Sequence, residues 1–460
     1  TDPEESAAIE HVKMVTGLEV TRVVSAPSEI EKIIKQFFGF KSSVKMAEMQ
    51  VTDRWAALGN LEQLSELKAE DEISSSDKAI QTAVEFLLKD SLEQRASDVH
   101  IEPKRNETVV RMRIDGVLMD AQKIPKAVHN ALISRIKLLA RLDISEKRRP
   151  QDGRIKVQQD GREVEMRVSV LPVAFGEKIV IRIFDAEMAF KGLDELGFFP
   201  EEIGRYRRFL EKPHGIILVT GPTGSGKTST LYSSLQHVAS AEKNVVTIED
   251  PIEMVVPQFN QVGVQPNIEV TFASALRAVL RQDPDIIMIG EIRDKETAAN
   301  AVQAALTGHL VFSTLHTNDT ASSISRLYDL AVEPYQASSA LIGIVAQRLM
   351  RVICTGCKTG IKMSAPDLAE IGFAEQGSIR LYKGDGCEHC RFTGYYGRTG
   401  VHEVLEVNEN IRKLINRAEP GEKLRAEAGK AGTKTLWENA IRKVTSGLTT
   451  LEEARRIFSE

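Results

Sequence analysis

The sequence contains no apolar run long enough to cross a membrane. Its longest near-apolar stretches, 215–220 and 286–290, fall far short of the roughly 18 residues that a membrane-spanning helix needs. The opening residues, TDPEESAAIE, have neither the basic start nor the apolar stretch of a secretory signal. We therefore expect the protein to reside in the cytoplasm and to have no transmembrane segment.

Aromatic side chains are scarce, and neither sign of charge dominates. Aromatic residues make up 5% of the 460 residues, and 60 Lys and Arg stand against 65 Asp and Glu, for a net charge of −5. Proteins that coat duplexes need a basic field, and proteins that bind single strands stack bases on aromatic rings. The composition therefore disfavours a nucleic-acid partner. The 42% hydrophobic and 27% charged content is that of a soluble globular protein, here of about three domains.

Only four cysteines are present, and they form two Cys-x-x-Cys pairs, Cys354 with Cys357 and Cys387 with Cys390. Four thiolates are the number that a closed structural Zn²⁺ site requires, and in a reducing compartment they favour a metal over disulfides. The 29 residues between the pairs exceed the usual ribbon spacing and indicate an extended insertion. Free buried thiols or a redox pair are the alternatives. His389, inside the second pair, could replace a cysteine, but we expect it to be exposed.

Changes in the period of the hydrophobic pattern divide the chain into parts. The elements predicted in the first half are helices over about 77–95 and 126–141, alternating strands over 109–114 and 163–170, and Asp-Gly hairpin turns at 115–116 and 160–161. Beyond Pro213, apolar strands alternate with helices, which is typical of a parallel sheet covered on both faces. The predicted parts are the remnant of an N-terminal domain at 1–40, a linker at 41–76, a small α+β domain at 77–186 and an α/β domain at 187–460.

A glycine-rich loop follows the first strand of the α/β part. The strand at 215–220 runs into GPTGSGKT at 221–228, and the next residues can continue as a helix, so the pattern G-x-x-x-x-G-K-[ST] stands in its required strand-loop-helix context. Backbone N–H groups of such a loop surround nucleotide phosphates, with Lys227 on the β and γ phosphates and the Thr228 hydroxyl on Mg²⁺. The predicted nucleotide-binding residues are Gly221, Pro222, Thr223, Gly224, Ser225, Gly226, Lys227, Thr228 and Ser229.

Two further strand ends carry the groups that nucleotide hydrolysis needs. The strand at 286–289 ends in Gly290 and Glu291, and a carboxylate at that position can orient the attacking water. The acid that usually precedes it is replaced by Gly290, so we expect water or other acids to complete the Mg²⁺ site. The strand at 310–315 ends in His316, which could sense or polarise the γ-phosphate. His309, just before that strand, is a weaker candidate.

The missing acids have a candidate position at the end of the strand at 245–248. Glu249, Asp250 and Glu253 follow it, and we expect Glu249 beside the reacting water and Asp250 and Glu253 beside Mg²⁺. The simpler reading, for these acids and for Glu291, is a solvated turn at the end of a strand.

Over about residues 77–460, the chain resembles a known family, the secretion-type ATPases of bacterial type II secretion and type IV pilus assembly. The motifs that carry the resemblance are RASDVHIEP at 95–103, KRRPQDGRI at 147–155, GPTGSGKT at 221–228, TIEDPIE at 247–253, LRQDPDIIMIGEIRD at 280–294 and GHLVFSTLHTND at 308–319. The family also has glycine before the catalytic glutamate, so Gly290 fits the resemblance.

The resemblance implies a small α+β domain followed by a RecA-like α/β P-loop ATPase domain, with a zinc-binding subdomain at about 350–400 and C-terminal helices. It also implies a homohexamer at the inner face of the inner membrane that hydrolyses Mg-ATP and moves an inner-membrane platform protein. In the family, arginines of the small domain reach the nucleotide, and the matching positions are Arg167 and Arg182, with Arg111 and Arg113 as secondary candidates. A surface salt bridge is the competing explanation for each arginine.

Within this family, FGEK at 175–178 favours pilus assembly, and a type II secretion ATPase is the alternative. A more distant alternative is a nucleic-acid translocase, because the same RecA-like core serves both activities. A nucleotide-gated assembly switch without useful turnover is a third interpretation, against which Glu291 argues.

Overall fold

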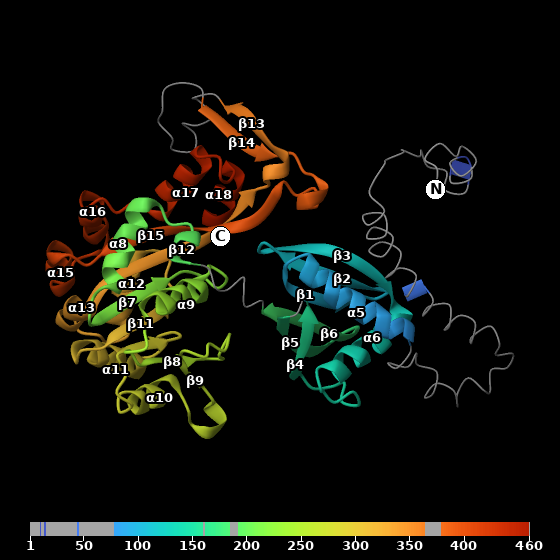
Figure 1. The fold of residues 1–460 in the computed structure, drawn as a ribbon, viewed down its shortest axis with the longest axis horizontal. Coiled ribbons are helices and arrows are strands. Elements are labelled where there is room, and N and C mark those ends of the chain that lie inside the picture. The colour runs from blue at the N-terminus through green and yellow to red at the C-terminus, as the bar shows by residue number, and fades with distance from the viewer. Residues whose placement is uncertain are drawn as a thin grey trace. The chain divides into compact units, whose positions relative to one another are not determined.

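The computed structural model describes residues 78–159, 162–184, 192–363 and 379–459, with isolated positions at 10, 13–14 and 44–45. Apart from those isolated positions, the predicted N-terminal remnant and linker lie outside the described residues, as does the predicted turn at 160–161. The chain forms two compact units, residues 1–184 and 185–460 (Figure 1). The domain boundaries expected from the sequence remain predictions.

Over residues 78–184, as far as they are described, the first unit is a six-stranded antiparallel sheet in the order β3-β2-β1-β6-β5-β4, with the helices α5 and α6. Its elements are α5 (Lys78–Glu93), β1 (Ala96–Pro103), β2 (Glu107–Ile114), β3 (Val117–Pro125), α6 (Lys126–Leu139), β4 (Gln151–Gln159), β5 (Arg162–Val173) and β6 (Gly176–Phe184). Alternate residues of the strands, such as Val99 and Ile101, pack against Ile80 and Leu87 of α5 in one core. The residues between them, which are mostly charged, lie on the opposite face because side chains alternate along a strand.

Backbone conformation sets the ends of these elements. The two helices end two residues before their predicted ends, and Arg95 and Arg141, with φ of 56° and 58°, stand where those ends were expected. A residue in the left-handed region commonly follows a helix and stops it. Asp115 and Gly116 also have positive φ, 49° and 86°, as a tight two-residue hairpin turn requires. The predicted hairpin between β2 and β3 is therefore confirmed.

The second unit is built on a seven-stranded sheet in the order β15-β12-β7-β11-β10-β8-β9. Its strands are β7 (Gly215–Thr220), β8 (Val245–Glu249), β9 (Asn260–Gly263), β10 (Ile286–Ile289), β11 (Leu310–Leu315), β12 (Leu341–Ile353) and β15 (Tyr395–Glu406). The four strands predicted from the sequence are confirmed and run parallel beside one another. The sheet as a whole is mixed, because the edge strand β15 pairs antiparallel with β12.

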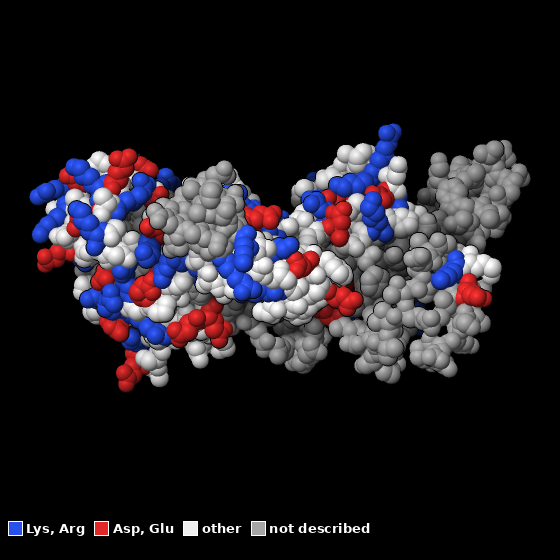
Figure 2. Space-filling model, turned by 90° about the horizontal axis from the view of Figure 1, so that it is seen from above, with Lys and Arg blue, Asp and Glu red and all other residues white. Residues whose placement is uncertain are grey.

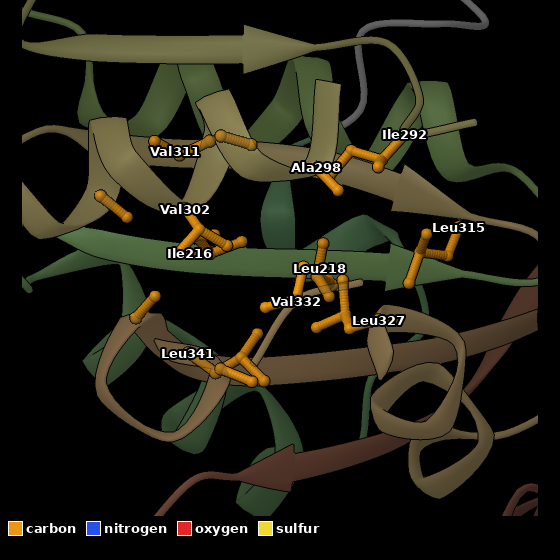
Figure 3. Close-up of a cluster of buried hydrophobic side chains, with 14 of the residues drawn as sticks. Ile216, Leu218, Ile292, Ala298, Val302, Val311, Leu315, Leu327, Val332 and Leu341 are labelled. Carbon is orange, nitrogen blue, oxygen red and sulfur yellow. The ribbon is translucent and has the colours of Figure 1, made fainter. Parts of the chain in front are cut away.

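Helices cover both faces of this sheet. They are α8 (Pro200–Leu210), α9 (Lys227–Val238), α10 (Phe272–Val279), α11 (Lys295–Leu306), α12 (Thr320–Asp329), α13 (Pro334–Ala340), α15 (Glu409–Asn416), α16 (Gly421–Lys430), α17 (Leu436–Thr445) and α18 (Leu451–Phe458). On one face, Ile216 and Leu218 of β7 pack with Ala298 and Val302 of α11 (Figure 3). The other face packs against α8 and α9. Strands buried on both faces explain the continuous apolar runs in the sequence.

Two helix caps place the loops at the carboxyl edge of the sheet. An Asp294 oxygen accepts a hydrogen bond from the Thr297 N–H (2.8 Å) and caps α11. An Asp319 oxygen does the same for the Ser322 N–H (2.8 Å) and caps α12. Because an N-cap fixes where a helix begins, these aspartates hold the short segments that carry Glu291 and His316.

Among the described residues, no helix combines the length and the apolar character needed to cross a lipid bilayer. On the face drawn in Figure 2, basic and acidic side chains are interspersed over the described part of the molecule.

Candidate functional site

The phosphate loop, residues 221–228, connects β7 to α9, so the predicted strand-loop-helix context is confirmed. Gly221, Gly224 and Gly226 have φ of 150°, 78° and 87°, a backbone region that favours glycine. A Cβ on Gly221 would lie 2.5 Å from the carbonyl oxygen of Gln347. Only glycine fits there, and the first N–H groups of α9 are left open to bind an anion.

The side chains of the loop divide into an exposed rim and a buried base. Pro222, Thr223 and Thr228 are exposed, Ser229 is half-buried, and Ser225 is buried. Among the described residues, the Ser225 hydroxyl has no hydrogen-bond partner. A buried, unpaired hydroxyl in a glycine cradle suits a loop that receives a phosphate oxygen.

Gln347 on β12 holds the base of the loop, a role that the sequence reasoning missed. Its side-chain amide donates to the Ser225 carbonyl oxygen (2.7 Å) and accepts from the Thr230 hydroxyl (2.9 Å). The residue is 1% exposed. A single amide therefore joins the loop to the first turn of α9. The signal in the sequence is a lone amide within the apolar strand LIGIVAQRLM.

Lys227 lies folded onto its own loop. Its ammonium donates to the carbonyl oxygens of Gly221 (2.8 Å) and Pro222 (3.1 Å). Burial lowers the pKa of Lys227 to about 8, while the negative charge of Glu291 opposes that shift and the positive charge of Arg348 adds to it. Among the described residues, these two carbonyls are the hydrogen-bond partners of the partly desolvated ammonium, which can exchange them for phosphate oxygens.

Glu291 and His316 meet at the ends of neighbouring strands. The His316 Nε2 atom lies 3.4 Å from a Glu291 carboxylate oxygen, and the Glu291 side chain is 15% exposed while that of His316 is 52% exposed. Arg293, which the sequence reasoning missed, approaches the other Glu291 oxygen at 2.5 Å. Its hydrogen bond to Glu291 raises the pKa of Arg293, and the charge of Asp250 adds to that shift. The structure thus brings Glu291 together with one histidine and one arginine.

The packing of β8 explains the glycine before Glu291. A Cβ on Gly290 would lie 3.2 Å from the Ile248 carbonyl oxygen and 3.6 Å from the Glu249 Cα atom. The Gly290 carbonyl also accepts a hydrogen bond from the Thr314 hydroxyl (2.7 Å), which ties β10 to β11. A side chain at this position would be tight against β8, which favours glycine over the usual acid.

The three acids after β8 do not share one environment. Glu249 is 3% exposed and accepts hydrogen bonds from the Tyr232 hydroxyl (2.6 Å), the Thr247 hydroxyl (2.7 Å) and the Gln261 amide (3.0 Å). Burial and the contact with Glu249 raise the pKa of Tyr232, which therefore stays a donor. These contacts engage both Glu249 oxygens and favour a role in anchoring α9.

Asp250 and Thr228 are exposed and Glu253 is half-buried. Their role as magnesium ligands stays a prediction. His309 lies elsewhere: its Nδ1 atom is 2.9 Å from the Ala304 carbonyl oxygen at the end of α11, which is a structural contact.

The segment after His316 is tied to the phosphate-loop strand. The Thr317 N–H donates to the Thr220 hydroxyl (2.9 Å), and the two threonine hydroxyls lie 2.7 Å apart. Arg348, next to Gln347, donates to the Asn318 side chain (3.1 Å). The histidine segment and the phosphate loop are therefore held in a fixed relation.

The four cysteines converge in the insertion after β12. Their sulfur atoms all lie within 4.8 Å of one another, at 3.8 Å for Cys354 with Cys387 and 3.7 Å for Cys357 with Cys390. Four sulfurs placed tetrahedrally at about 2.3 Å from zinc would be about 3.8 Å apart. The N–H groups of Gly386 and Gly394 also donate to sulfur atoms. The residues present therefore fit a structural zinc.

The chain between the cysteine pairs forms the hairpin β13 (Lys358–Met363) and β14 (Ile379–Gly384), as far as the residues are described. The predicted extended insertion is therefore confirmed. His389 is exposed, as expected, and stacks on Tyr396 with ring centres 4.1 Å apart. It does not belong to the sulfur cluster.

The predicted arginines belong to the first unit. Arg167 on β5 and Arg182 on β6 are directly paired in the sheet. The Arg167 guanidinium lies 4.4 Å from the centre of the Phe184 ring, and Arg182 contacts Asp98. Of the secondary candidates, Arg111 lies 3.6 Å from Glu102, and Arg113 lies 3.7 Å from Asp98.

The chain is similar in sequence to ATPases of type IV pilus assembly and of type II secretion. A type IV pilus assembly ATPase PilB of Thermus thermophilus is 43% identical over 98% of this chain, which spans half of that relative's length. The type II secretion system ATPase E of Vibrio cholerae is 43% identical over 85% of this chain and 78% of its own.

Among solved structures, the pilus retraction motor PilT with bound ADP is 27% identical, covers 80% of this chain and 95% of its own, and has a TM-score of 0.54. The ATPase DotB of Legionella pneumophila shares the fold at 20% identity and a TM-score of 0.60, over 82% of this chain and 95% of its own. The profile of the family described as type II/IV secretion system protein matches residues 74–456. The chain therefore belongs to this family, the secretion-type ATPases.

Proposed function

We propose that this chain is a Mg-ATP hydrolase that acts as the motor of type IV pilus assembly. The observation that carries the proposal is the pairing of Glu291 with His316 at strand ends beside a complete phosphate loop. The chain spans half of the length of the Thermus relative. The proposal therefore extends to the activity of the whole protein.

ATP binding begins at the loop. The N–H groups at the start of α9 and the Lys227 ammonium receive the phosphates, and the ammonium leaves the carbonyl oxygens of Gly221 and Pro222 to do so. The Thr228 hydroxyl would hold Mg²⁺, with Asp250 and Glu253 reaching it through water. The metal, when bound, neutralises charge that develops on the phosphoryl group.

Hydrolysis then depends on Glu291. Its carboxylate orients a water and accepts its proton, once Arg293 has released the oxygen that it contacts. His316 polarises or senses the γ-phosphate from the neighbouring strand end. Arg167 and Arg182 supply positive charge to the same phosphoryl group, a contribution that in phosphoryl transfer is worth about 10³ to 10⁵ in rate.

The wider setting follows from the family. We infer a homohexamer in the cytoplasm, peripheral to the inner face of the inner membrane, that moves an inner-membrane platform protein without a nucleic-acid partner. The Thermus relative and the Acinetobacter baylyi relative, which is 43% identical over 95% of this chain, are both named pilus assembly ATPases. A structural Zn²⁺ on Cys354, Cys357, Cys387 and Cys390 would hold the insertion in shape and take no part in hydrolysis.

A type II secretion ATPase is the second candidate, because relatives named for the type II secretion system match equally well, at 46% and 43% identity. Deleting the gene in its host separates the two. Loss of surface pili with normal protein secretion would support pilus assembly, and the opposite result would support type II secretion.

Glu291→Gln should keep ATP binding and lower turnover by about 10² to 10⁴, because an amide cannot accept the proton of water. Phosphate release and the affinity for a fluorescent ATP analogue would be measured together. Glu242→Gln, at an exposed acid after α9, is the matched control and should behave like the wild type. Normal turnover in Glu291→Gln would defeat the proposal.

ATP affinity should fall as the pH rises through about 8. The Lys227 ammonium is present below its pKa of about 8 and is lost above it, so the attraction for phosphate weakens in that direction. Titrations with the same analogue from about pH 7 to about pH 9 would show this. Lys227→Arg should remove the pH dependence, because a guanidinium stays charged. An affinity that is constant across this range in the wild type would contradict the expectation.

Gln347→Ala should weaken ATP binding about tenfold and lower the free energy of unfolding by about 1 to 3 kcal/mol, because it leaves the Ser225 carbonyl and the Thr230 hydroxyl unpaired in the interior. Equilibrium titration and urea unfolding measure the two effects. Gln303→Ala, at an exposed position on α11, is the control. Unchanged affinity would show that the loop keeps its shape without this amide.

The purified chain should contain one zinc per molecule, and Cys354→Ser combined with Cys387→Ser should remove it. Without the metal, backbone hydrogen exchange should rise across 354–394, because no ion then links the four cysteine sulfurs. Elemental analysis and exchange mass spectrometry would record both. Protein that is purified without chelators and holds no metal would end the zinc assignment.

A further inference from the structure

One row of directly paired residues across the six-stranded sheet of the first unit, called the rung below, carries four arginines and one aspartate. The register pairs Arg113 with Asp98, Asp98 with Arg182, Arg182 with Arg167, and Arg167 with Arg154. Directly paired residues place their side chains on the same face of a sheet, and like charges in this position repel each other. Glu165 lies 3.4 Å from Arg154 and 3.9 Å from Arg167, so the four arginines outnumber the acids beside them, Asp98 and Glu165, and the row keeps a net positive charge.

Asp98 is the acid of this rung, and its side chain is 11% exposed. One carboxylate oxygen accepts a hydrogen bond from the Arg182 Nε–H (3.1 Å). The other accepts from the Ser97 hydroxyl (2.8 Å) and lies 3.7 Å from the Arg113 Nε atom. The carboxylate thus stands between two arginines and is fixed by a neighbouring hydroxyl.

The contact with Arg182 uses only one edge of the guanidinium. It is made by Nε, and among the described residues the two Nη atoms have no hydrogen-bond partner, while the side chain is 62% exposed. Arg351 shows the other arrangement in the same chain. Its Nε and Nη2 both donate to Glu453, and its side chain is 17% exposed. Both Nε and Nη2 of Arg351 are engaged by its partner, whereas the Nη groups of Arg182 stay available to a ligand.

We propose that Asp98 is a positioning residue for Arg182: it holds the Nε edge so that the two Nη groups are presented as a fork to a phosphoryl group. This inference rests on the proposed function, in which Arg182 contacts the nucleotide. A guanidinium fork matches two phosphate oxygens, and fixing its stem removes rotamer freedom that binding would otherwise have to remove.

A double-mutant cycle in the full chain tests the inference. Asp98→Ala should lower the turnover number for ATP about tenfold and change nucleotide affinity less than about twofold. The reason is that Asp98 sets the orientation of Arg182, which acts during phosphoryl transfer. Arg182→Ala should lower turnover further. In the double variant, turnover should equal that of Arg182→Ala within about twofold, since Asp98 acts only through this arginine.

Two more variants separate positioning from general stability. Asp98→Asn keeps an oxygen that can accept from Nε, so it should retain more turnover than Asp98→Ala. Should Asp98→Ala fail to fold, as judged by circular dichroism, the cycle is run with Asp98→Asn and the same comparison. Glu107→Gln, which breaks the pair with Lys123 (2.9 Å) in the same sheet, should leave turnover within about twofold.

The outcomes that overturn the inference are distinct. Full turnover in Asp98→Ala overturns it, as does a loss that repeats undiminished in the Arg182→Ala background, because Asp98 would then act apart from Arg182. In both cases the proposed role of Arg182 survives if Arg182→Ala itself is slow. Full turnover in Arg182→Ala overturns the inference and the proposed role of that arginine together.

Discussion

The candidate site depends on how closely the backbone of β12 approaches the phosphate loop. The Gln347 carbonyl occupies the space that a side chain at residue 221 would need, and its amide joins Ser225 to Thr230. A loop of this kind exposes many N–H groups and has few contacts of its own, so its shape must come from a neighbour. Here the neighbour is the middle of a buried strand, which is among the most rigid supports that a fold can offer.

The parallel sheet supplies the other half of the arrangement. Because β7, β10 and β11 run in the same direction, the residues that follow them emerge at one edge, and this is how Glu291 and His316 meet although 25 positions separate them in the chain. Hydrogen bonds then fix the relation between the strand ends, through Thr314 to Gly290 and through Thr317 to Thr220.

Much of this fold could be predicted from the sequence, because its signals are local. The apolar runs at 215–220 and 310–315 are strands buried on both faces, and the Asp-Gly pair at 115–116 forms the expected turn. What the sequence did not reveal depends on partners distant in the chain. The position of Gln347 under the loop, the pairing of Arg293 with Glu291, and the burial of Glu249 under α9 each need the sheet order. The four cysteines could be predicted as a set, because two Cys-x-x-Cys motifs can be recognised in the sequence without knowing the sheet order.

The strand that supports the phosphate loop also leads to the cysteine cluster. Gln347 and Cys354 are seven positions apart, about 23 Å at roughly 3.3 Å per residue. Over most of this distance β12 is paired with β15, and the register of the pairing shifts between Arg351 and Ile353. Gln347 supports the phosphate loop from the same strand that ends directly before Cys354, so a change in the pairing register of β12 would displace the loop support and the first cysteine together.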